Sequence, residues 1–178
     1  MKYAVKTSML VIVSFFVFVL ASGVSAAELA APLKPLAFLV GRWDGGGVVA
    51  DTGGTAKGFS TITVEANGGV LLRKDHTALF DKAGKLTGGF DQVMMIYPDA
   101  GGVRADYSDG QHLIHYTSAR VEPGRSVEFI GDARPGAPTF RLRYEIEGPD
   151  VLTVTFGVVP PGQTTFQPIA TGELHRAK

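Results

Sequence analysis

From Gly41 onward, short apolar-rich segments alternate with turns made of Gly, Pro and Asp. The segments are rich in Val, Ile, Thr, Phe and Tyr, a composition typical of β-strands. We expect ten strands, near residues 43–50, 58–66, 70–80, 86–97, 102–107, 111–120, 126–131, 139–147, 151–159 and 169–177. Because the connections are short, consecutive strands should be antiparallel neighbours in a meander. No stretch after Gly41 carries a helical stripe, so the predicted fold class is all-β.

The clearest alternation of apolar and polar residues runs through FRLRYEIEGPDVLTVTF, residues 140–156. A three-residue loop at 148–150 pairs Ile146 with Leu152 and places Tyr144 and Phe156 on the same apolar face. The other face carries charged residues. This hairpin should therefore be buried on one side and solvated on the other.

A second hairpin is expected in VRADYSDGQHLIHY, residues 103–116. Asp-Gly at 109–110 is typical of a two-residue type I′ turn, because both residues tolerate positive φ. That turn pairs Tyr107 with His112 and brings Tyr116 onto the same face. We expect this face to be mainly apolar, with three polar tips.

A third hairpin is expected around Lys-Ala-Gly at 82–84, where Gly suits the left-handed position of a three-residue loop. Its register pairs His76 with Phe90 and Lys74 with Gln92, and places Met94 on the same face. This face is predicted to be apolar overall, with His76 pointing inward.

Ten antiparallel strands with one apolar face need that face covered. No helices are expected to cover it, so the sheet should close on itself as a β-barrel. A barrel of about eight or more strands leaves room for a ligand. A flattened barrel filled by its own side chains is the competing structure.

The N-terminal residues have the order of a secretory signal. Lys2 and Lys6 precede an apolar run at 9–21, and small residues occupy 24–26. The run is shorter than the roughly 20 residues that span a bilayer, so no stable membrane insertion is expected after cleavage. We therefore divide the chain into a signal peptide (1–26), a leader and short apolar cap (27–40) and a barrel domain (41–178). The expected location is periplasmic or secreted.

The charge balance and the cysteine content exclude several classes of partner and modification. The chain has 17 basic and 17 acidic residues, and the signal contains two of the basic ones and none of the acidic ones. Without a basic surplus, nucleic acid is not an expected partner. The chain contains no Cys, which excludes disulfides and lipidation of an N-terminal cysteine.

The segment LVGRWDGGG, residues 39–47, carries a family resemblance. Gly41-x-Trp43 at the first strand resembles the opening motif of lipocalins. The longer pattern, with Gly45 and Gly47, is similar to the motif that opens nitrobindins, which are ten-stranded haem-binding barrels. The exported, Cys-free chain looks most like lipocalin-like bacterial proteins of unknown function. The resemblance implies that Trp43 lies across the barrel floor and that Arg176 stacks on it.

The nitrobindin resemblance does not extend to the haem ligand. That family closes with a His-Leu pair ahead of a strand that ends in Arg, and the His binds the iron. Aligning Leu174 and Arg176 with that pattern puts Ile169 at the His position. No cofactor is therefore expected, and haem is kept as an alternative that would need His76 or His112.

No catalytic or metal-binding motif stands out. The pair His112 and His115 is three residues apart, and on a strand such residues point to opposite faces, so they are not expected to share a metal ion. Asp75 and His76 are adjacent and form no dyad for the same reason. No nucleophile elbow or phosphate loop is present.

The leading hypothesis is an exported, non-enzymatic protein that binds a small, mainly apolar molecule inside the barrel. One alternative is a haem-dependent or acid–base isomerase using His112 or His76. Another is a filled barrel that acts as a structural or interaction module of the cell envelope. The expected ligand-binding residues are Tyr107, His112, Tyr116, His76, Phe90, Met94, Tyr144 and Phe156, and the expected barrel-closure residues are Gly41, Trp43, Gly45, Gly47 and Arg176.

Overall fold

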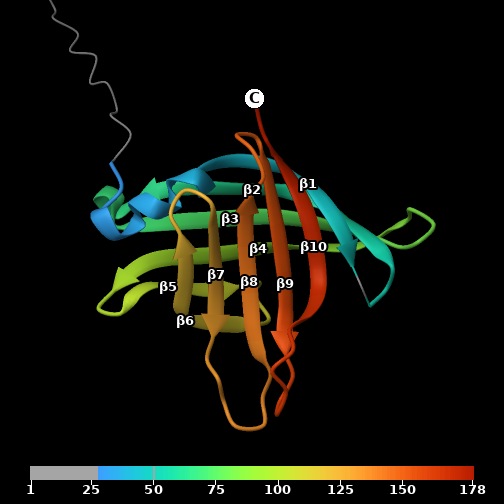
Figure 1. Cartoon of the computed structure of the whole chain (residues 1–178). Coiled ribbons are helices and arrows are strands. Elements are labelled where there is room, and N and C mark those ends of the chain that lie inside the picture. The colour runs from blue at the N-terminus through green and yellow to red at the C-terminus, as the bar shows by residue number, and fades with distance from the viewer. Residues whose placement is uncertain (1–27, 50) are drawn as a thin grey trace, which may run out of the picture.

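The computed structural model describes residues 28–49 and 51–178, so the expected signal peptide lies outside the described residues. These residues form a closed barrel of ten antiparallel strands in meander order, which confirms the predicted fold class (Figure 1). The strands are β1 (Gly41–Val49), β2 (Gly54–Glu65), β3 (Val70–Phe80), β4 (Leu86–Asp99), β5 (Gly102–Ser108), β6 (Leu113–Glu122), β7 (Ser126–Gly131), β8 (Thr139–Ile146), β9 (Val151–Val159) and β10 (Gln167–Arg176).

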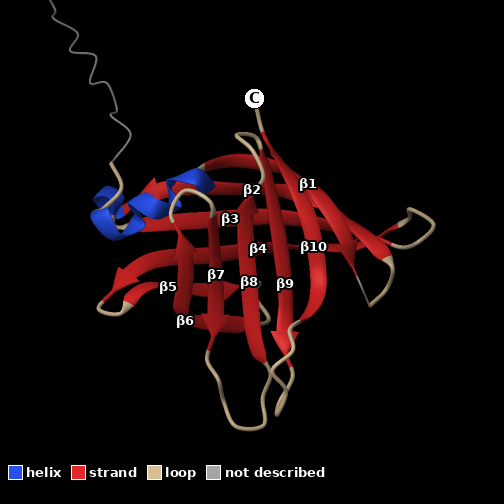
Figure 2. Cartoon of the chain, viewed as in Figure 1, coloured by secondary structure: helices blue, strands red, loops and turns tan. Residues whose placement is uncertain are grey.

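A short 3-10 helix, η1 (Ala31–Leu39), precedes the barrel, and a single turn, η2 (Ala66–Gly68), joins β2 to β3 (Figure 2). In η1, Leu33, Leu36 and Leu39 are fully buried in the barrel core, so this segment is the apolar cap that the sequence suggested. Neither described helix combines the length and the apolar character that crossing a membrane requires.

The helix η1 covers one end of the barrel. The N–H of Ala30 donates to Gly68 O beside β2 and β3, and the N–H of Gly124 between β6 and β7 donates to Pro35 O. We call this the closed end. In a meander, the turns β1–β2, β3–β4, β5–β6, β7–β8 and β9–β10 all lie at the opposite end, which we call the open end.

Trp43 is fully buried at the closed end. Its indole Nε1 donates to Leu39 O at 2.8 Å, which fixes the end of η1 against the first strand. The Arg176 guanidinium lies 4.1 Å from the centroid of the indole ring and donates to Val40 O and Phe38 O. Gly41 makes room for it, because a Cβ there would lie 2.7 Å from Arg176 Nη1. The expected Trp–Arg stack is therefore present.

The glycines that follow Trp43 serve the sheet rather than the indole. A Cβ on Gly47 would lie 1.9 Å from Thr171 O of β10, and one on Gly46 would lie 1.9 Å from Ala56 O of β2. The backbones of three strands thus approach too closely for side chains at these positions. The approaching backbone belongs to the flanking strands β2 and β10.

The hairpin of β8 and β9 has the predicted register. Ile146 pairs with Leu152, and Tyr144 pairs with Val154 on the same inner face. The outward side chains of β8 include charged residues that pair with one another, as Arg143 does with Glu145. Alternation and turn length are sufficient to define this hairpin.

The hairpin of β3 and β4 differs from the prediction. Phe80 pairs with Leu86 as expected, but the next pair is Leu79 with Gly88, so β4 contains one extra residue at Thr87. This β-bulge moves the rest of β3 by one position, which exchanges its two faces. His76 and Lys74 therefore point outward, and the prediction that they face the interior is wrong. On β4 the prediction holds, because Met94 is buried inside.

The hairpin of β5 and β6 also has a different turn. Asp109 Oδ1 accepts the backbone N–H groups of Gln111 and His112, at 2.9 and 2.7 Å, and these bonds fold a four-residue connection instead of a two-residue turn. Tyr107 therefore pairs with Ile114 rather than with His112. A shift of two residues keeps the same faces inside. His112, however, falls in the loop with 72% of its side chain exposed, so its predicted inward position is wrong.

Candidate functional site

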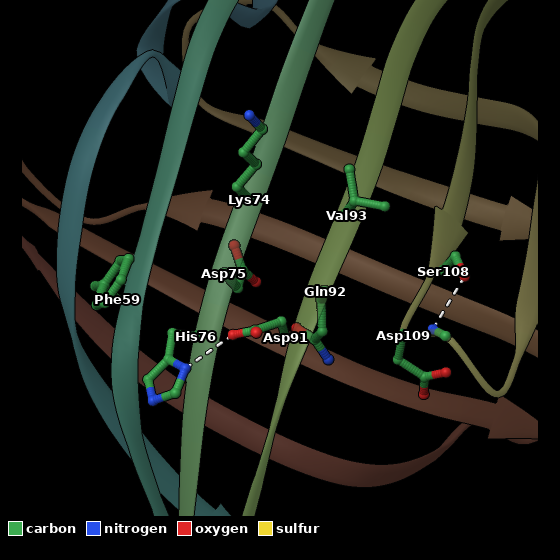
Figure 3. Close-up of a pocket in the computed structure, with 10 residues that line it drawn as sticks. Phe59, Lys74, Asp75, His76, Asp91, Gln92, Val93, Ser108 and Asp109 are labelled. Carbon is green, nitrogen blue, oxygen red and sulfur yellow. Dashed lines mark hydrogen bonds and ion pairs between the residues drawn. The ribbon is translucent and has the colours of Figure 1, made fainter.

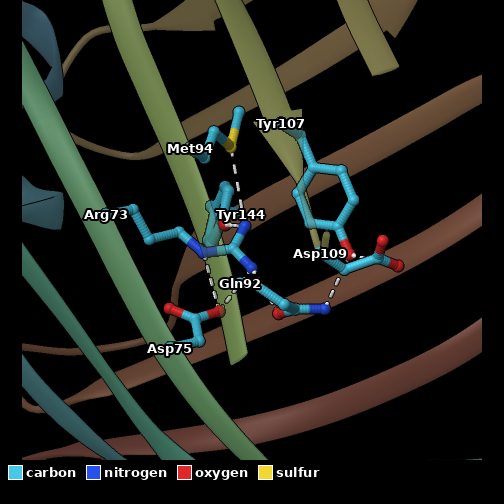
Figure 4. A network of polar contacts seen from close by, with 7 residues as sticks. All are labelled: Arg73, Asp75, Gln92, Met94, Tyr107, Asp109 and Tyr144. Carbon is cyan, nitrogen blue, oxygen red and sulfur yellow. Dashed lines mark hydrogen bonds and ion pairs between the residues drawn. The ribbon is translucent and has the colours of Figure 1, made fainter. Parts of the chain in front are cut away.

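The interior of the barrel is crossed by a buried arginine. Arg73 lies on the inner face of β3 and is only 6% exposed. Its Nη1 donates to the hydroxyl of Tyr144 on β8 at 2.5 Å (Figure 4). In the closed order of strands, β3 and β8 lie opposite each other. The Arg73–Tyr144 contact thus crosses the core between the closed end and the open end.

The guanidinium of Arg73 uses all of its donor groups within the barrel. Nε and Nη2 donate to Asp75 Oδ2, and Nη2 also donates to Gln92 Oε1 at 2.9 Å. Nη1 donates to Tyr144 and lies 3.5 Å from the sulfur of Met94. A guanidinium has five N–H donors, and these contacts account for all five.

The charge of Arg73 is stable in this environment. Burial acts to lower its pKa, but the Tyr144 oxygen and the Asp75 carboxylate more than offset that, and the net pKa lies above the ordinary value. A buried charge that is paired and fully hydrogen-bonded avoids most of the cost of desolvation. We therefore treat Arg73 and Asp75 as an ion pair.

The network continues from Arg73 to the rim of the open end. Gln92 Nε2 donates to the Tyr107 hydroxyl at 2.9 Å, and this hydroxyl is 3.5 Å from Asp109 Oδ2 (Figure 4). Asp109 also contacts the His112 ring at 3.0 Å. One chain of polar contacts therefore joins the buried arginine to the exposed β5–β6 loop.

Three tyrosines on the inner wall are held in their neutral form. Burial raises the pKa of Tyr107 and of Tyr144 to about 12, and it raises the pKa of Tyr116 as well. At neutral pH these hydroxyls are hydrogen-bonding groups rather than charges. This arrangement suits recognition of a ligand better than proton abstraction.

Two buried oxygens beside Arg73 have no partner among the described residues, and they are Ser60 Oγ and Asp75 Oδ1. Ser60 is 5% exposed and lies directly opposite Asp75 in the pairing of β2 with β3. Buried polar atoms are nearly always hydrogen-bonded in folded proteins. Each of these two atoms therefore has an unused capacity for a hydrogen bond.

The open end carries an aromatic and aliphatic wall. Phe140 and Phe156 stack in parallel with ring centroids 5.9 Å apart. Tyr107 and Ile114 are partly buried and pack against the same core. Phe90 is half-buried and shares the inner face of Gln92 on β4. The open end therefore combines apolar rings with the polar groups below them.

Six of the eight ligand-binding candidates from the sequence face the interior, namely Tyr107, Tyr116, Phe90, Met94, Tyr144 and Phe156. His76 and His112 do not. The His76 side chain is 54% exposed and pairs with Asp91 at 2.8 Å. The bulge at Thr87 and the longer β5–β6 loop, respectively, place these two rings outside.

All four histidines lie within the described residues, and each pairs with a carboxylate on the outer surface or in a loop. His112 pairs with Asp109 and His115 with Asp106, so the two rings do not converge. Within residues 28–49 and 51–178, no group of three or more metal-ligating side chains is assembled. A haem inside this barrel would find no inward imidazole for its iron.

A depression of about 610 Å³ lies on the wall over β3, β4 and β5. Figure 3 shows its rim, where Phe59 lies beside His76 and His76 contacts Asp91. Most of the side chains around it, including Lys74 and Val93, belong to the outer face of the strands. Asp75 and Gln92 also line it, so the depression adjoins the polar network from outside.

Sequence reasoning missed Arg73, Asp75 and Ser60 as interior groups, whereas Gln92 lies on the inner face of β4 as predicted. The available signal was the pattern Leu71-x-Arg73-x-Asp75, in which opposite charges two residues apart share one face of a strand with a leucine.

A comparison of the chain with models of known protein families finds no match, and a comparison with curated proteins finds no significant match. The function of this barrel is therefore argued from its own side chains.

Proposed function

We propose that this protein is an exported, lipocalin-like carrier that binds a small, mainly apolar molecule in the open end of its barrel. The observation that carries the proposal is the inner wall around and above Arg73, which combines half-buried aromatic rings with polar groups, among them two unpartnered oxygens. Binding sites for small molecules commonly combine an apolar lining with a few fixed polar groups. Phe90, Phe140 and Phe156 would contact the apolar body of the ligand.

Export is part of the same proposal and rests on the N-terminal sequence. Lys2, Lys6 and the apolar run at 9–21 have the order of a secretory signal. Cleavage after Ala26 would release a chain that begins just before η1. Mass determination of the protein recovered from its own host would give the mature N-terminus, and an intact Met1 would contradict export with cleavage.

The alternative of a filled barrel is favoured only at the closed end. There, the leucines of η1 and the ring of Trp43 are fully buried in one continuous core, which extends past Tyr144 to Phe129 and Leu142. The inward-facing aromatic residues of the open end are only partly buried. The ligand is therefore assigned to the open end alone.

Binding is tested on purified protein that has been unfolded, washed free of small molecules and refolded. A panel of phenols, fatty alcohols, fatty acids and haem is titrated by calorimetry. We expect at least one apolar member to bind. Ala170, half-buried on the inner face beside Phe156, is changed to Phe to fill the open end. We expect Ala170→Phe to weaken binding at least about tenfold.

The matched control is Thr171→Phe, one residue further along β10, where the side chain is exposed on the outer face. It adds the same ring without filling the interior, so its affinity should equal that of the unchanged protein. If no member of the panel binds, or if both variants weaken binding equally, the proposal of an interior ligand is wrong.

A further inference from the structure

The hydrogen-bonding state of the interior selects the chemical class of the ligand. We propose that the ligand presents an uncharged hydrogen-bond donor, a hydroxyl or an N–H, to Asp75 Oδ1 and Ser60 Oγ, and that the site rejects carboxylates. This inference rests on the proposed function and specifies the polar end of the molecule that the open end binds.

A buried arginine would ordinarily suggest an anionic ligand, because a guanidinium binds carboxylates in a bidentate manner. Arg73 does not offer that site. Its five donors are used by Asp75, Gln92, Tyr144 and Met94, and the two contacts with the Asp75 carboxylate already form the ion pair. An incoming carboxylate would have to displace Asp75 and leave it buried without a partner, which is costly.

The unpartnered atoms have the opposite character. Asp75 Oδ1 is a carboxylate oxygen and can only accept. Ser60 Oγ can accept one hydrogen bond and donate another. Since Ser60 and Asp75 lie directly opposite each other on neighbouring strands, one donor group placed between them would be shared by both oxygens.

The charges around the open end act in the same direction. The nearest other ionised group on the polar chain is Asp109, whose pKa is lowered to about 2 by the backbone N–H of His112, so it is negative at neutral pH. The charge of Arg73 is offset by Asp75. An anion entering past Tyr107 would therefore meet the Asp109 carboxylate first, and the cation of Arg73 behind it is already paired with Asp75.

The test uses three probes that share one apolar body and differ at one group: 4-butylbenzyl alcohol, 4-butylbenzoate and 4-butyltoluene. We expect the alcohol to bind, and both the carboxylate and the hydrocarbon to bind at least about tenfold more weakly, in line with the loss of a hydrogen bond to a charged group. If the carboxylate binds tightest, or if all three agree within about threefold, the donor rule is overturned while interior binding stands. If none of the three binds, and the wider panel also fails, the proposed function itself falls.

Two variants locate the effect. Asp75→Asn leaves Arg73 without its carboxylate and turns part of the acceptor into a donor, so preference should reverse toward 4-butylbenzoate. Ser60→Ala is milder and should weaken the alcohol about threefold to tenfold while leaving the hydrocarbon unchanged. The control is Asp91→Asn, an exposed carboxylate on the outer face of β4. If Asp91→Asn changes the affinity for the alcohol as much as Ser60→Ala does, Ser60 and Asp75 are not the groups that bind the donor of the ligand. The same conclusion follows if the Asp75→Asn protein folds and still prefers the alcohol.

Discussion

Arg73 on β3 donates a hydrogen bond of 2.5 Å to the Tyr144 hydroxyl on β8, across the width of the barrel. The contact crosses the core between the leucines and Trp43 of the closed end and the aromatic rings of the open end. One side chain thus stabilises the fold and forms the floor of the candidate site. The energetic and functional roles of Arg73 can be separated by experiment.

Arg73→Met should lower the free energy of unfolding by about 3–5 kcal/mol, because it leaves Asp75 buried without its cation. The double variant Arg73→Met, Asp75→Asn should recover part of that loss. Urea unfolding measures both effects. The control is Arg120→Met, which removes an exposed arginine from Glu128 while Glu128 keeps Arg141 as a partner, so it should cost less than about 1 kcal/mol. Equal losses of unfolding free energy in the two arginine variants would show that the buried pair contributes no more to stability than an ion pair with an exposed arginine.

Arg176→Met should destabilise the barrel by about 2–3 kcal/mol. The substitution removes the stack on Trp43 and leaves the carbonyls of Val40 and Phe38 without their donor. Arg42 lies 4.2 Å over the Phe59 ring but is half-exposed, so Arg42→Met should cost less than about 1 kcal/mol. Thermal and urea unfolding give the free energy of unfolding of each variant, so the two arginine–aromatic contacts can be compared directly. A cost for Arg42→Met as large as that for Arg176→Met would contradict this account.

Gly46→Ala should lower the free energy of unfolding by about 3 kcal/mol or more, since its methyl group would lie 1.9 Å from Ala56 O. Gly88→Ala places the same group in open space and should leave stability unchanged or raise it by up to about 1 kcal/mol. Both residues lie in strands, so β-propensity alone would treat them alike. Similar values for the two variants would mean that β1 does not depend on close approach of its neighbours.

The stability of the protein should depend on Asp109 at acid pH. The backbone N–H of His112, together with the His112 ring and the N–H of Gln111, lowers the pKa of Asp109 from 3.8 to about 2. A lowered pKa means that the stabilisation is present above about pH 4 and is lost as the pH falls toward 2. Asp109→Asn should therefore be less stable than the unchanged protein at pH 6, and the difference should shrink between pH 4 and 2. A difference that stays constant over this range would contradict the assignment.

The fold was predictable because its signals are local. The loop at 148–150 and the alternation around it are sufficient to pair Ile146 with Leu152. The same applies to the order of the strands, since short turns leave only neighbouring pairs. The stack of Arg176 on Trp43 followed from the resemblance of residues 41–47 and the position of the last strand, rather than from periodicity.

The site was only partly predictable because single residues in two hairpins determine which side chains face the interior. One extra residue at Thr87 exchanges the faces of β3, so Arg73 and Asp75 lie inside and His76 lies outside. The one local signal for the observed register was the pattern Leu71-x-Arg73-x-Asp75, and it is weak because charged residues occupy both faces of that strand. His112 was displaced by the Asp109 side chain, which can cap either a two-residue or a four-residue connection.

The most direct test is to map the bound alcohol by NMR, using 4-butylbenzyl alcohol and protein labelled on its aromatic and methyl groups. We expect the largest shift changes at Phe90, Ile114, Phe140 and Phe156 of the open end, with small changes at Leu36 and Leu39 beneath Arg73. Changes confined to Phe59, His76 and Val93 would place the molecule in the outer depression instead. That result would contradict the claim that the ligand lies inside the barrel.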